Sequence, residues 1–219
     1  MKVVNLSENN SLLGLYLAEL RNKDIQHDPL RFRRNIERMG EIMAYEISKT
    51  LAYQPKEIST PLADIVVPAL TDKIVLATIF RAGLPMHSGM LNYFDRAENA
   101  FVSAYREYTD DSHTDVRIVI EYLASPLLDG KTLIISDPML ATGGSMELAY
   151  KALLTKGNPA TVHLCSVIAA SPAVEYLQKQ FGQENVTLWV GAVDPMLNEQ
   201  KYIVPGLGDA GDLAFGTKD

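Results

Sequence analysis

Cysteine, long apolar runs and excess positive charge are scarce or absent in this sequence, and each absence excludes a class of protein. The only cysteine, Cys165, lies in the apolar run 161–170 and is most simply a buried hydrophobic residue, so we expect neither a disulfide framework nor a cysteine metal site. No apolar run is long enough to span a membrane, and residues 1–10 lack the apolar core of a signal peptide. We therefore expect a cytoplasmic protein.

The formal net charge is −7 at pH 7, which argues against broad nucleic-acid binding. An anionic substrate remains compatible with this charge, since helix amides, a few arginines and a metal ion create a local positive field. The sequence also lacks low-complexity segments and fixed-period repeats, and its 47% hydrophobic and 21% charged residues are typical of a globular protein. We expect residues 1–219 to form one domain, with residues 1–60 as an N-terminal arm and a long helix.

Strand and helix patterns alternate along most of the chain, which favours an α/β fold. The continuous apolar runs 73–80, 132–135, 161–170 and 186–194 are typical of strands buried on both faces of a parallel sheet. Segments with helical periodicity or helix-capping residues lie between several of them. Right-handed crossovers between such strands give a doubly wound, mostly parallel sheet.

The first 70 residues are less regular. Residues 1–27 are hard to read, although residues 12–23 suit a short helix or a strand that lies over the body. The pair 28–29, Asp-Pro, suits a helix start, and apolar residues spaced by three and four then predict an amphipathic helix to about Ala52. Two prolines in 55–61 indicate a loop, and residues 65–70 fit a short edge strand.

The stretch 133–156 combines a strand, a glycine-containing turn and a helix in immediate succession, an arrangement that builds phosphate sites. Asp137 closes the strand with a carboxylate, and the turn 142–145 reads Thr-Gly-Gly-Ser. Two glycines let the backbone approach a ligand closely, while the free amides and positive dipole end of the new helix favour an anion. Taken alone, the turn is at least as well explained as a plain connection with Ser145 as the helix N-cap.

Two further segments carry candidate functional groups. Arg81 follows the run 73–80 beside Gly83, which places a guanidinium at the carboxyl edge of the sheet, where open α/β folds bind ligands. As bare sequence, a surface turn is the simpler interpretation. Residues 100–124 alternate like two strands joined by the polar tip 109–115, which predicts a projecting hairpin that covers a site.

The C-terminal segment 202–217 has four glycines and two aspartates in sixteen residues, too irregular for a helix or a strand. Such composition is typical of functional loops. Without a relative to compare, a glycine-rich tail packed over the sheet is the simpler interpretation.

The string 137–145, Asp-Pro-Met-Leu-Ala-Thr-Gly-Gly-Ser, resembles the 5-phosphoribosyl-1-pyrophosphate (PRPP) motif of type I phosphoribosyltransferases, in the form typical of uracil phosphoribosyltransferases. Three more segments resemble this family in the same order: the turn 81–83, the hairpin strand with Arg106, and residues 202–212. The resemblance covers nearly the whole chain. It implies the type I phosphoribosyltransferase fold, with a hairpin arm at 100–124 and a base-binding hood at 195–219.

The reaction implied by the resemblance is uracil plus PRPP giving UMP and pyrophosphate, in pyrimidine salvage. The catalytic residues carried over from the family are Arg81, Arg106, Asp137 and Asp209. The residues implied to bind PRPP are these four together with Pro138, Met139, Leu140, Ala141, Thr142, Gly143, Gly144 and Ser145. Those implied to bind uracil are Tyr202, Ile203, Gly208, Asp209 and Ala210, largely through backbone groups.

The resemblance has departures. The turn after Arg81 contains Pro85 and His87-Ser88 where the family usually continues Leu-Gly-Met, and Glu107 stands in the hairpin where the family has aspartate. Leu213 stands where the family commonly has arginine. These departures leave the local turn and the hairpin contacts open, together with the role of position 213.

Cofactor and partners also follow from the resemblance. It implies Mg²⁺, bound mainly through PRPP oxygens and water, since the sequence shows no preformed set of metal ligands. It implies a homodimer or a higher homo-oligomer, and it raises GTP as an effector because some members are activated by it. No nucleic acid or membrane partner is expected.

Two other functions remain open on the sequence. One is a regulator of the same fold that senses PRPP or nucleotides and binds RNA or a partner, which the charge of −7 disfavours. The other is a phosphoribosyltransferase for a different base, which the C-terminal string disfavours.

Overall fold

The fold is built on one eight-stranded sheet, seen in the computed structural model of residues 1–219, which describes all of them except 109–115, 183–184 and 218–219 and the side chains of 104–119. The strand order is β1-β10-β9-β7-β4-β5-β6, and the short β8 pairs with β9. Their bounds are β1 Lys2–Asn5, β4 Ile74–Phe80, β5 Glu98–Tyr108, β6 Val116–Ala124, β7 Thr132–Ser136, β8 Met139–Leu140, β9 Thr161–Ala170 and β10 Val186–Asp194. All of these pairs are parallel except β5 with β6. The predicted mostly parallel sheet and the hairpin between β5 and β6 are confirmed.

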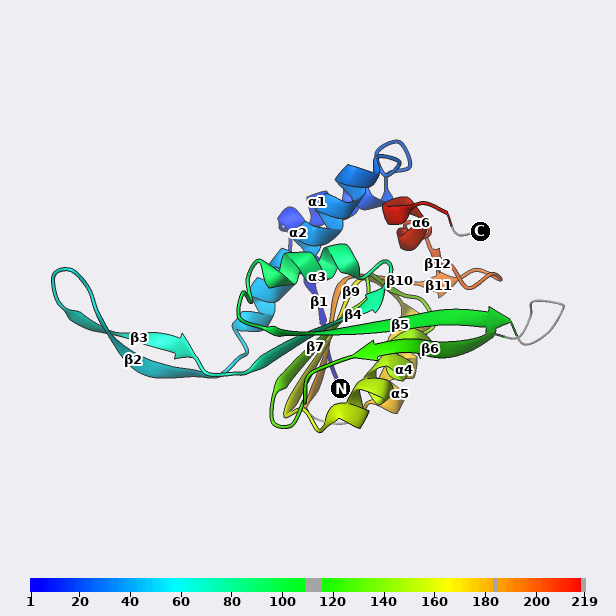
Figure 1. The fold of residues 1–219 in the computed structure, drawn as a ribbon. Helices are drawn as coiled ribbons and strands as arrows, with labels where there is room; N and C mark the ends of the chain where they lie inside the picture. Colours follow the sequence, from blue (N-terminus) through cyan, green and yellow to red (C-terminus); the bar gives the residue numbers. More distant parts are fainter. Residues whose placement is uncertain (109–115, 183–184, 218–219) are drawn as a thin grey trace.

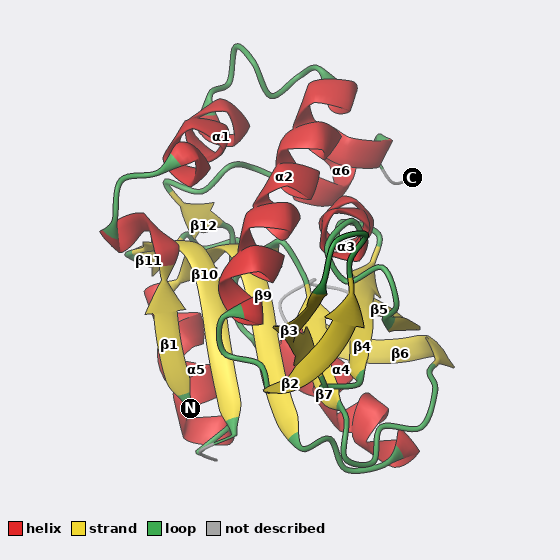
Figure 2. Ribbon diagram, turned by 90° about the vertical axis from the view of Figure 1, so that its left-hand side faces the viewer, coloured by secondary structure: helices red, strands yellow, loops and turns green. Residues whose placement is uncertain are grey.

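Helices cover both faces of this sheet (Figure 1, Figure 2). One face is covered by α1 Leu12–Arg21, α2 Pro29–Ser48 and α3 Leu84–Leu91, and the other by α4 Gly144–Leu153 and α5 Ser171–Gln180. The sheet has one hydrophobic core under α1, α2 and α3, called the first core, and another under α4 and α5, called the second core. In β4 the buried Ile74 and Leu76 belong to the first core, while Val75 belongs to the second. Alternation along a strand that is buried on both sides thus feeds two cores, and the doubly wound prediction is confirmed. No helix in the described ranges is long and apolar enough to cross a membrane.

Helix α2 begins as predicted but ends sooner. Its N-cap is Asp28, whose Oδ1 accepts hydrogen bonds from the backbone N–H groups of Leu30 and Arg31 at 3.0 and 3.2 Å. The predicted end near Ala52 is wrong, because the helix ends at Ser48. After it, the N–H of Thr50 and its hydroxyl both donate to the carbonyl of Ile47, which closes the last turn.

The predicted loop at 55–61 is also wrong over most of its length. Residues Tyr53–Ser59 form β2, which pairs antiparallel with β3, Asp64–Leu70, and the two strands project far from the body (Figure 1). Pro55 stands directly opposite Pro68. Both strands are edge strands, where proline is tolerated because its missing N–H leaves no partner within a central sheet unsatisfied.

The N-terminal residues form a strand and a helix, and α1 Leu12–Arg21 confirms the helical alternative predicted for residues 12–23. β1 adds an edge to the sheet beside β10, and the hydroxyl of Ser7 donates to the carbonyl of Gly191. Helix α1 then packs on α2, with Leu13, Leu17 and Leu20 in the first core.

Strand β9 carries two titratable side chains, Cys165 and His163, into the core. Cys165 is fully buried, as predicted, and burial raises the pKa of its thiol. His163 accepts a hydrogen bond at Nδ1 from the indole Nε1–H of Trp189 at 3.0 Å, so the neutral ring carries its proton on Nε2. That Nε2 has no hydrogen-bond partner in the described part of the chain. Burial lowers the pKa of His163 to about 4, because the imidazolium would lose its hydration.

We expect the free energy of unfolding to fall as the pH drops from about 6.5 toward 4. In this window His163 is protonated in the unfolded chain and neutral in the folded one, so protons favour unfolding by about 2 kcal/mol at about pH 5. The variant His163→Gln removes this contribution and should lose correspondingly less stability between about pH 7 and pH 5. Urea titrations followed by the fluorescence of Trp189, the single tryptophan, measure both proteins, and an equal pH dependence would contradict the assignment.

Candidate active site

The loop between β7 and α4 is shaped by a glycine in the left-handed region. Gly143 has φ of 87° and stands at the N-cap of α4, so Ser145 is the second residue of the helix rather than its cap. A Cβ on Gly143 would lie 2.9 Å from Cδ1 of Tyr176, which packs directly beneath the loop. Glycine is therefore required at this position both by conformation and by space. The N–H of Gly144 donates to Oγ1 of Thr142 at 3.5 Å, and the next amides of the first turn of α4 have no partner within the helix, as anion sites require.

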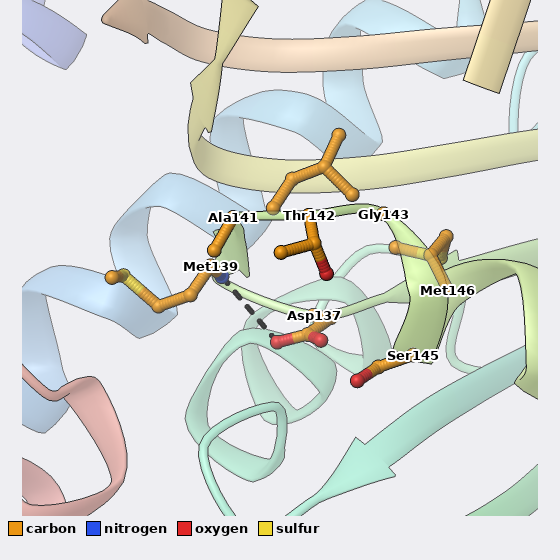
Figure 3. Close-up of a pocket in the computed structure, with 8 residues that line it drawn as sticks. Asp137, Met139, Ala141, Thr142, Gly143, Ser145 and Met146 are labelled. Carbon is orange, nitrogen blue, oxygen red and sulfur yellow. Dashed lines mark hydrogen bonds between the residues drawn. The ribbon is translucent and has the colours of Figure 1, made fainter. Parts of the chain in front are cut away.

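This loop lines a hollow of about 230 Å³, part of it open to solvent. Its lining residues are Asp137, Met139, Leu140, Ala141, Thr142, Gly143, Ser145 and Met146. Figure 3 shows the side-chain oxygens of Asp137, Thr142 and Ser145 around the same space. Oδ1 of Asp137 accepts a hydrogen bond from the N–H of Met139 at 3.3 Å, which orients the carboxylate. The hollow thus brings most of the residues predicted to bind PRPP together.

Behind the loop, Glu147 and Tyr176 form a supporting pair that no sequence pattern indicated. The hydroxyl of Tyr176 donates to Oε2 of Glu147 at 2.5 Å, and Nζ of Lys151 donates to Oε1 at 2.6 Å. Burial raises the pKa of the Glu147 carboxyl, but the hydrogen bonds from Lys151 and Tyr176 outweigh burial and lower it overall. The ionised Glu147 therefore holds the ring of Tyr176 in place under Gly143.

Arg81 directly follows β4, in a turn that packs on the end of β7. A Cβ on Gly83 would lie 2.9 Å from the carbonyl oxygen of Ser136, so the turn after β4 packs directly on the end of β7. Nη2 of Arg81 donates to Oδ1 of Asp212 at 2.9 Å, and Nη1 donates to the carbonyl of Gly216 at 3.1 Å. Its Nε is buried and has no hydrogen-bond partner among the described residues. The guanidinium is thus held against the C-terminal segment, while the side chain as a whole stays 33% exposed.

The departures after Arg81 are accommodated within α3. Pro85 fits the first turn of the helix, where its missing N–H leaves nothing unsatisfied. His87 is buried, and its Nε2 forms a hydrogen bond of 2.8 Å with Oδ1 of Asn99. Burial lowers the pKa of His87. The turn that the sequence left open thus contains a cis peptide bond between Phe80 and Arg81 and runs through Gly83 directly into α3.

The C-terminal segment folds over the same edge of the sheet (Figure 1). It contains β11 Met196–Leu197, β12 Ile203–Val204 and α6 Ala210–Phe215. Ile203 and Ala210 are buried, Gly208 has φ of 89°, and Asp209 caps α6 by accepting from the N–H of Asp212 at 3.0 Å. Tyr202 is 47% exposed, so its predicted place in the wall of a base pocket stays a prediction.

Glycine also joins the C-terminal segment to the arginine. A Cβ on Gly211 would lie 3.2 Å from Oδ1 of Asp209 and 3.5 Å from Nη2 of Arg81. The first turn of α6, which begins at the predicted uracil residue Ala210, therefore rests against the guanidinium of Arg81, which was predicted to bind PRPP. The ion pair of Arg81 with Asp212 was not foreseen, because nothing in the sequence pairs residues 131 positions apart.

The predicted role of Arg106 stays untested. Arg106 belongs to β5, opposite Ile118 of β6, but its side chain lies outside the described part of the structure. The hairpin tip 109–115 lies outside it as well.

Comparisons with known proteins agree along the whole chain. A family model described as uracil phosphoribosyltransferase matches residues 7–217. The chain is 58% identical over 218 residues to a uracil phosphoribosyltransferase of Porphyromonas gingivalis, with 100% of both chains covered. It is 38% identical to one of Methanothermobacter thermautotrophicus, covering 95% of this chain and 93% of the relative. Among solved structures, the AQ2163 protein of Aquifex aeolicus superposes with a TM-score of 0.86 at 30% identity, over 98% of both chains.

Gly143→Ala should weaken PRPP binding by more than about tenfold. The left-handed conformation costs alanine about 1 to 2 kcal/mol, and the new methyl group would contact Tyr176, so the loop must shift away from its binding geometry. Gly130→Ala is the matched control, since Gly130 also has a positive φ, 68°, but open space around it. Both variants should lose stability through backbone strain, and Gly143→Ala should lose more because of its added contact with Tyr176. PRPP affinity by calorimetry and melting temperature are the measurements. Equal PRPP affinity in the two variants would contradict the assignment of residues 142–145 to phosphate binding.

Proposed function

This chain belongs to the uracil phosphoribosyltransferase family, and we propose that it joins uracil to the ribosyl phosphate of PRPP in the crevice between β4 and β7. It is a pentosyltransferase, and the products are UMP and pyrophosphate. The observation that carries the assignment to this crevice is the hollow lined by the loop 137–146, beside which lie Arg81 and the C-terminal segment. No observation favours a regulator of the same fold, since the family model and the relatives from Porphyromonas gingivalis and Methanothermobacter thermautotrophicus are described as the enzyme.

The reaction is a displacement at the anomeric carbon of the ribose. N1 of uracil forms a bond to this carbon while the bond from the carbon to a pyrophosphate oxygen breaks, and uracil loses its N1 proton. Positive charge develops on the sugar and negative charge on the leaving group, so the protein contributes positioning and electrostatic stabilisation. Every group described below serves one of these two tasks.

We assign the phosphate contacts by the charge and direction of the groups. Residues 142–145, with the first amides of α4, hold the 5-phosphate, and the carboxylate of Asp137 accepts hydrogen bonds from the ribose hydroxyls. Arg81, whose side chain is 33% exposed, neutralises pyrophosphate with its positive charge. Arg106 approaches from the hairpin arm, and Asp209 acts on the PRPP side of the base segment.

Magnesium accompanies the substrate in this proposal. In the described residues no group of three or more His, Cys, Asp or Glu side chains is placed to hold a metal ion. A site of this composition suits an ion that keeps water and substrate oxygens as ligands, with Asp137 as the nearest protein carboxylate of the loop. When bound, Mg²⁺ would neutralise charge on the pyrophosphate oxygens.

Base selection is assigned to fixed backbone groups of Ile203, Gly208 and Ala210. Uracil presents an N3–H donor between two carbonyl acceptors, whereas cytosine has an acceptor at N3 and an amino group in place of one carbonyl. A rigid backbone site cannot turn to suit both bases. Leu213 packs against the first core, and its Cδ1 would lie 3.6 Å from a Cβ on Gly208, so this residue contributes packing beside the base loop.

The decisive assay is UMP formation from uracil and PRPP, with cytosine as the competing base. We expect kcat/KM for uracil to exceed that for cytosine by at least about thirtyfold, because two buried pairs would be mismatched at about 1 to 3 kcal/mol each. Chelation of Mg²⁺ should abolish turnover, and GTP, proposed here as an effector, is added in a parallel arm. Comparable values for the two bases would refute backbone readout, and no UMP at all would refute the function.

We also propose that the protein works in the cytoplasm as a homodimer or a higher homo-oligomer. The hairpin β2–β3 supports this, since Leu62, Ile65 and Val66 are 97%, 52% and 63% exposed on an arm that projects from the body. An isolated two-stranded hairpin is marginally stable in water. A second copy of the chain that covers the hairpin would bury these side chains.

Val66→Lys should therefore shift the protein toward monomer, because a charge within a buried apolar contact is costly. Leu127→Lys is the matched control, as Leu127 is 69% exposed and lies outside the hairpin. Light scattering coupled to size exclusion measures both masses. An unchanged mass in Val66→Lys would remove the hairpin from the interface, and a monomeric natural protein would refute the oligomer.

A further inference from the structure

The end of helix α1 reaches the base-binding segment through one buried ion pair. Arg21, the last residue of α1, donates from Nη2 to Oδ1 of Asp194 at 2.7 Å and from Nη1 to Oδ2 at 2.8 Å. Asp194 ends β10 and is only 5% exposed. This two-pronged geometry is the strongest that an arginine and a carboxylate form.

The same ion pair holds both backbone groups of Gly206. The N–H of Gly206 donates to Oδ2 of Asp194 at 3.0 Å, and the carbonyl of Gly206 accepts from Nη1 of Arg21 at 2.9 Å. Gly206 has φ of 64°, and a Cβ there would lie 2.1 Å from the carbonyl oxygen of Ile203. Here the chain folds back on itself, and the ion pair fixes the fold-back at its tightest point.

A second side chain from the N-terminal region acts on the next residue. Nε2 of Gln26 donates to the carbonyl of Leu207 at 3.2 Å and to the carbonyl of Leu20 at 2.9 Å. Its Oε1 would lie 3.9 Å from a Cβ on Gly208. The backbone immediately before Gly208 is thus tied at two successive residues to the region around the end of α1.

We propose that Arg21 and Asp194, supported by Gln26, are positioning residues for base selection. The turn at Gly206 separates Ile203 from Gly208, whose backbone groups are assigned to the base, so its geometry sets their distance and direction. Selection by fixed backbone groups requires that the backbone does not adjust, and the ion pair supplies this rigidity. The inference rests on the proposed function. Neither residue contacts the reacting atoms, so both act through the backbone.

The test compares Arg21→Gln with Arg31→Gln. Arg31 forms the other two-pronged ion pair of α1, with Glu19 at 2.7 and 2.9 Å, but this pair joins α1 to α2 and does not touch the base segment. Each variant therefore removes one ion pair made by a residue of α1, that of Arg21 or that of Glu19. Only Arg21→Gln releases the turn at Gly206. Asp194→Asn, which keeps an acceptor for the Gly206 N–H, is expected to behave like a milder Arg21→Gln.

We expect Arg21→Gln to raise KM for uracil by about tenfold and to narrow the uracil-to-cytosine ratio of kcat/KM by about tenfold, as for loss of a charge-assisted contact. KM for PRPP should change by less than about twofold, because the hydrogen bonds that Arg21 and Asp194 make within the described residues do not include the loop 142–145. Arg31→Gln should leave both the ratio and the KM for uracil at the natural values. Arg21→Lys keeps the charge beside Asp194 but not the fork, so it tests the same point if Arg21→Gln fails to fold, and we expect an intermediate ratio.

Two outcomes would overturn the inference. The first is a folded Arg21→Gln or Arg21→Lys with the natural KM for uracil and the natural base ratio. The second is a fall in kcat alone with the ratio unchanged, which would indicate a merely structural role. Failure of the function itself would look different, because the natural protein would then form no UMP from uracil and PRPP, and this would overturn both proposals together.

Discussion

The contact between the turn after β4 and the end of β7 is the constraint on which the site depends. A Cβ on Gly83 would lie 2.2 Å from Oγ1 of Thr78 and 2.9 Å from the carbonyl of Ser136, so only glycine allows these segments to meet. The chain leaves β4 toward α3 on one face and leaves β7 toward α4 on the other. The two connections therefore diverge, and ligand-binding crevices open where neighbouring strands diverge in this way. Arg81 and Asp137 stand on its two sides.

Local signals in the sequence predict the part of the site that is continuous in the chain. The turn 142–145 is readable because glycines, a strand and a helix follow one another within a few residues, and the buried runs that became β4, β9 and β10 are readable because their apolar residues are uninterrupted. The resemblance to a family extended this to the C-terminal segment, whose glycine-rich composition has neither helical nor strand periodicity.

The remainder depends on groups that meet only after folding. Arg21 and Asp194 are separated by 173 positions, and Arg81 and Asp212 by 131, so no spacing rule links them. The predictions for the end of α2 and for residues 55–61 were wrong because they rested on local rules. Leu51 continues the apolar spacing beyond the end of the helix. Proline was taken as a loop signal, although a two-stranded ladder tolerates it. Tertiary context decides in both cases.

The opposed prolines of the β2–β3 hairpin affect how strongly the protein aggregates at high concentration. A long exposed strand is a template on which further strands from other molecules stack, and this is how soluble proteins turn into fibrils or inclusion bodies. Pro55 and Pro68 lie at the same level of the two strands, so each open edge lacks one amide donor there. Continuous strand stacking along either edge is interrupted, while the apolar side chains remain exposed. The hairpin is thereby suited to closed contacts through side chains and poorly suited to open-ended growth.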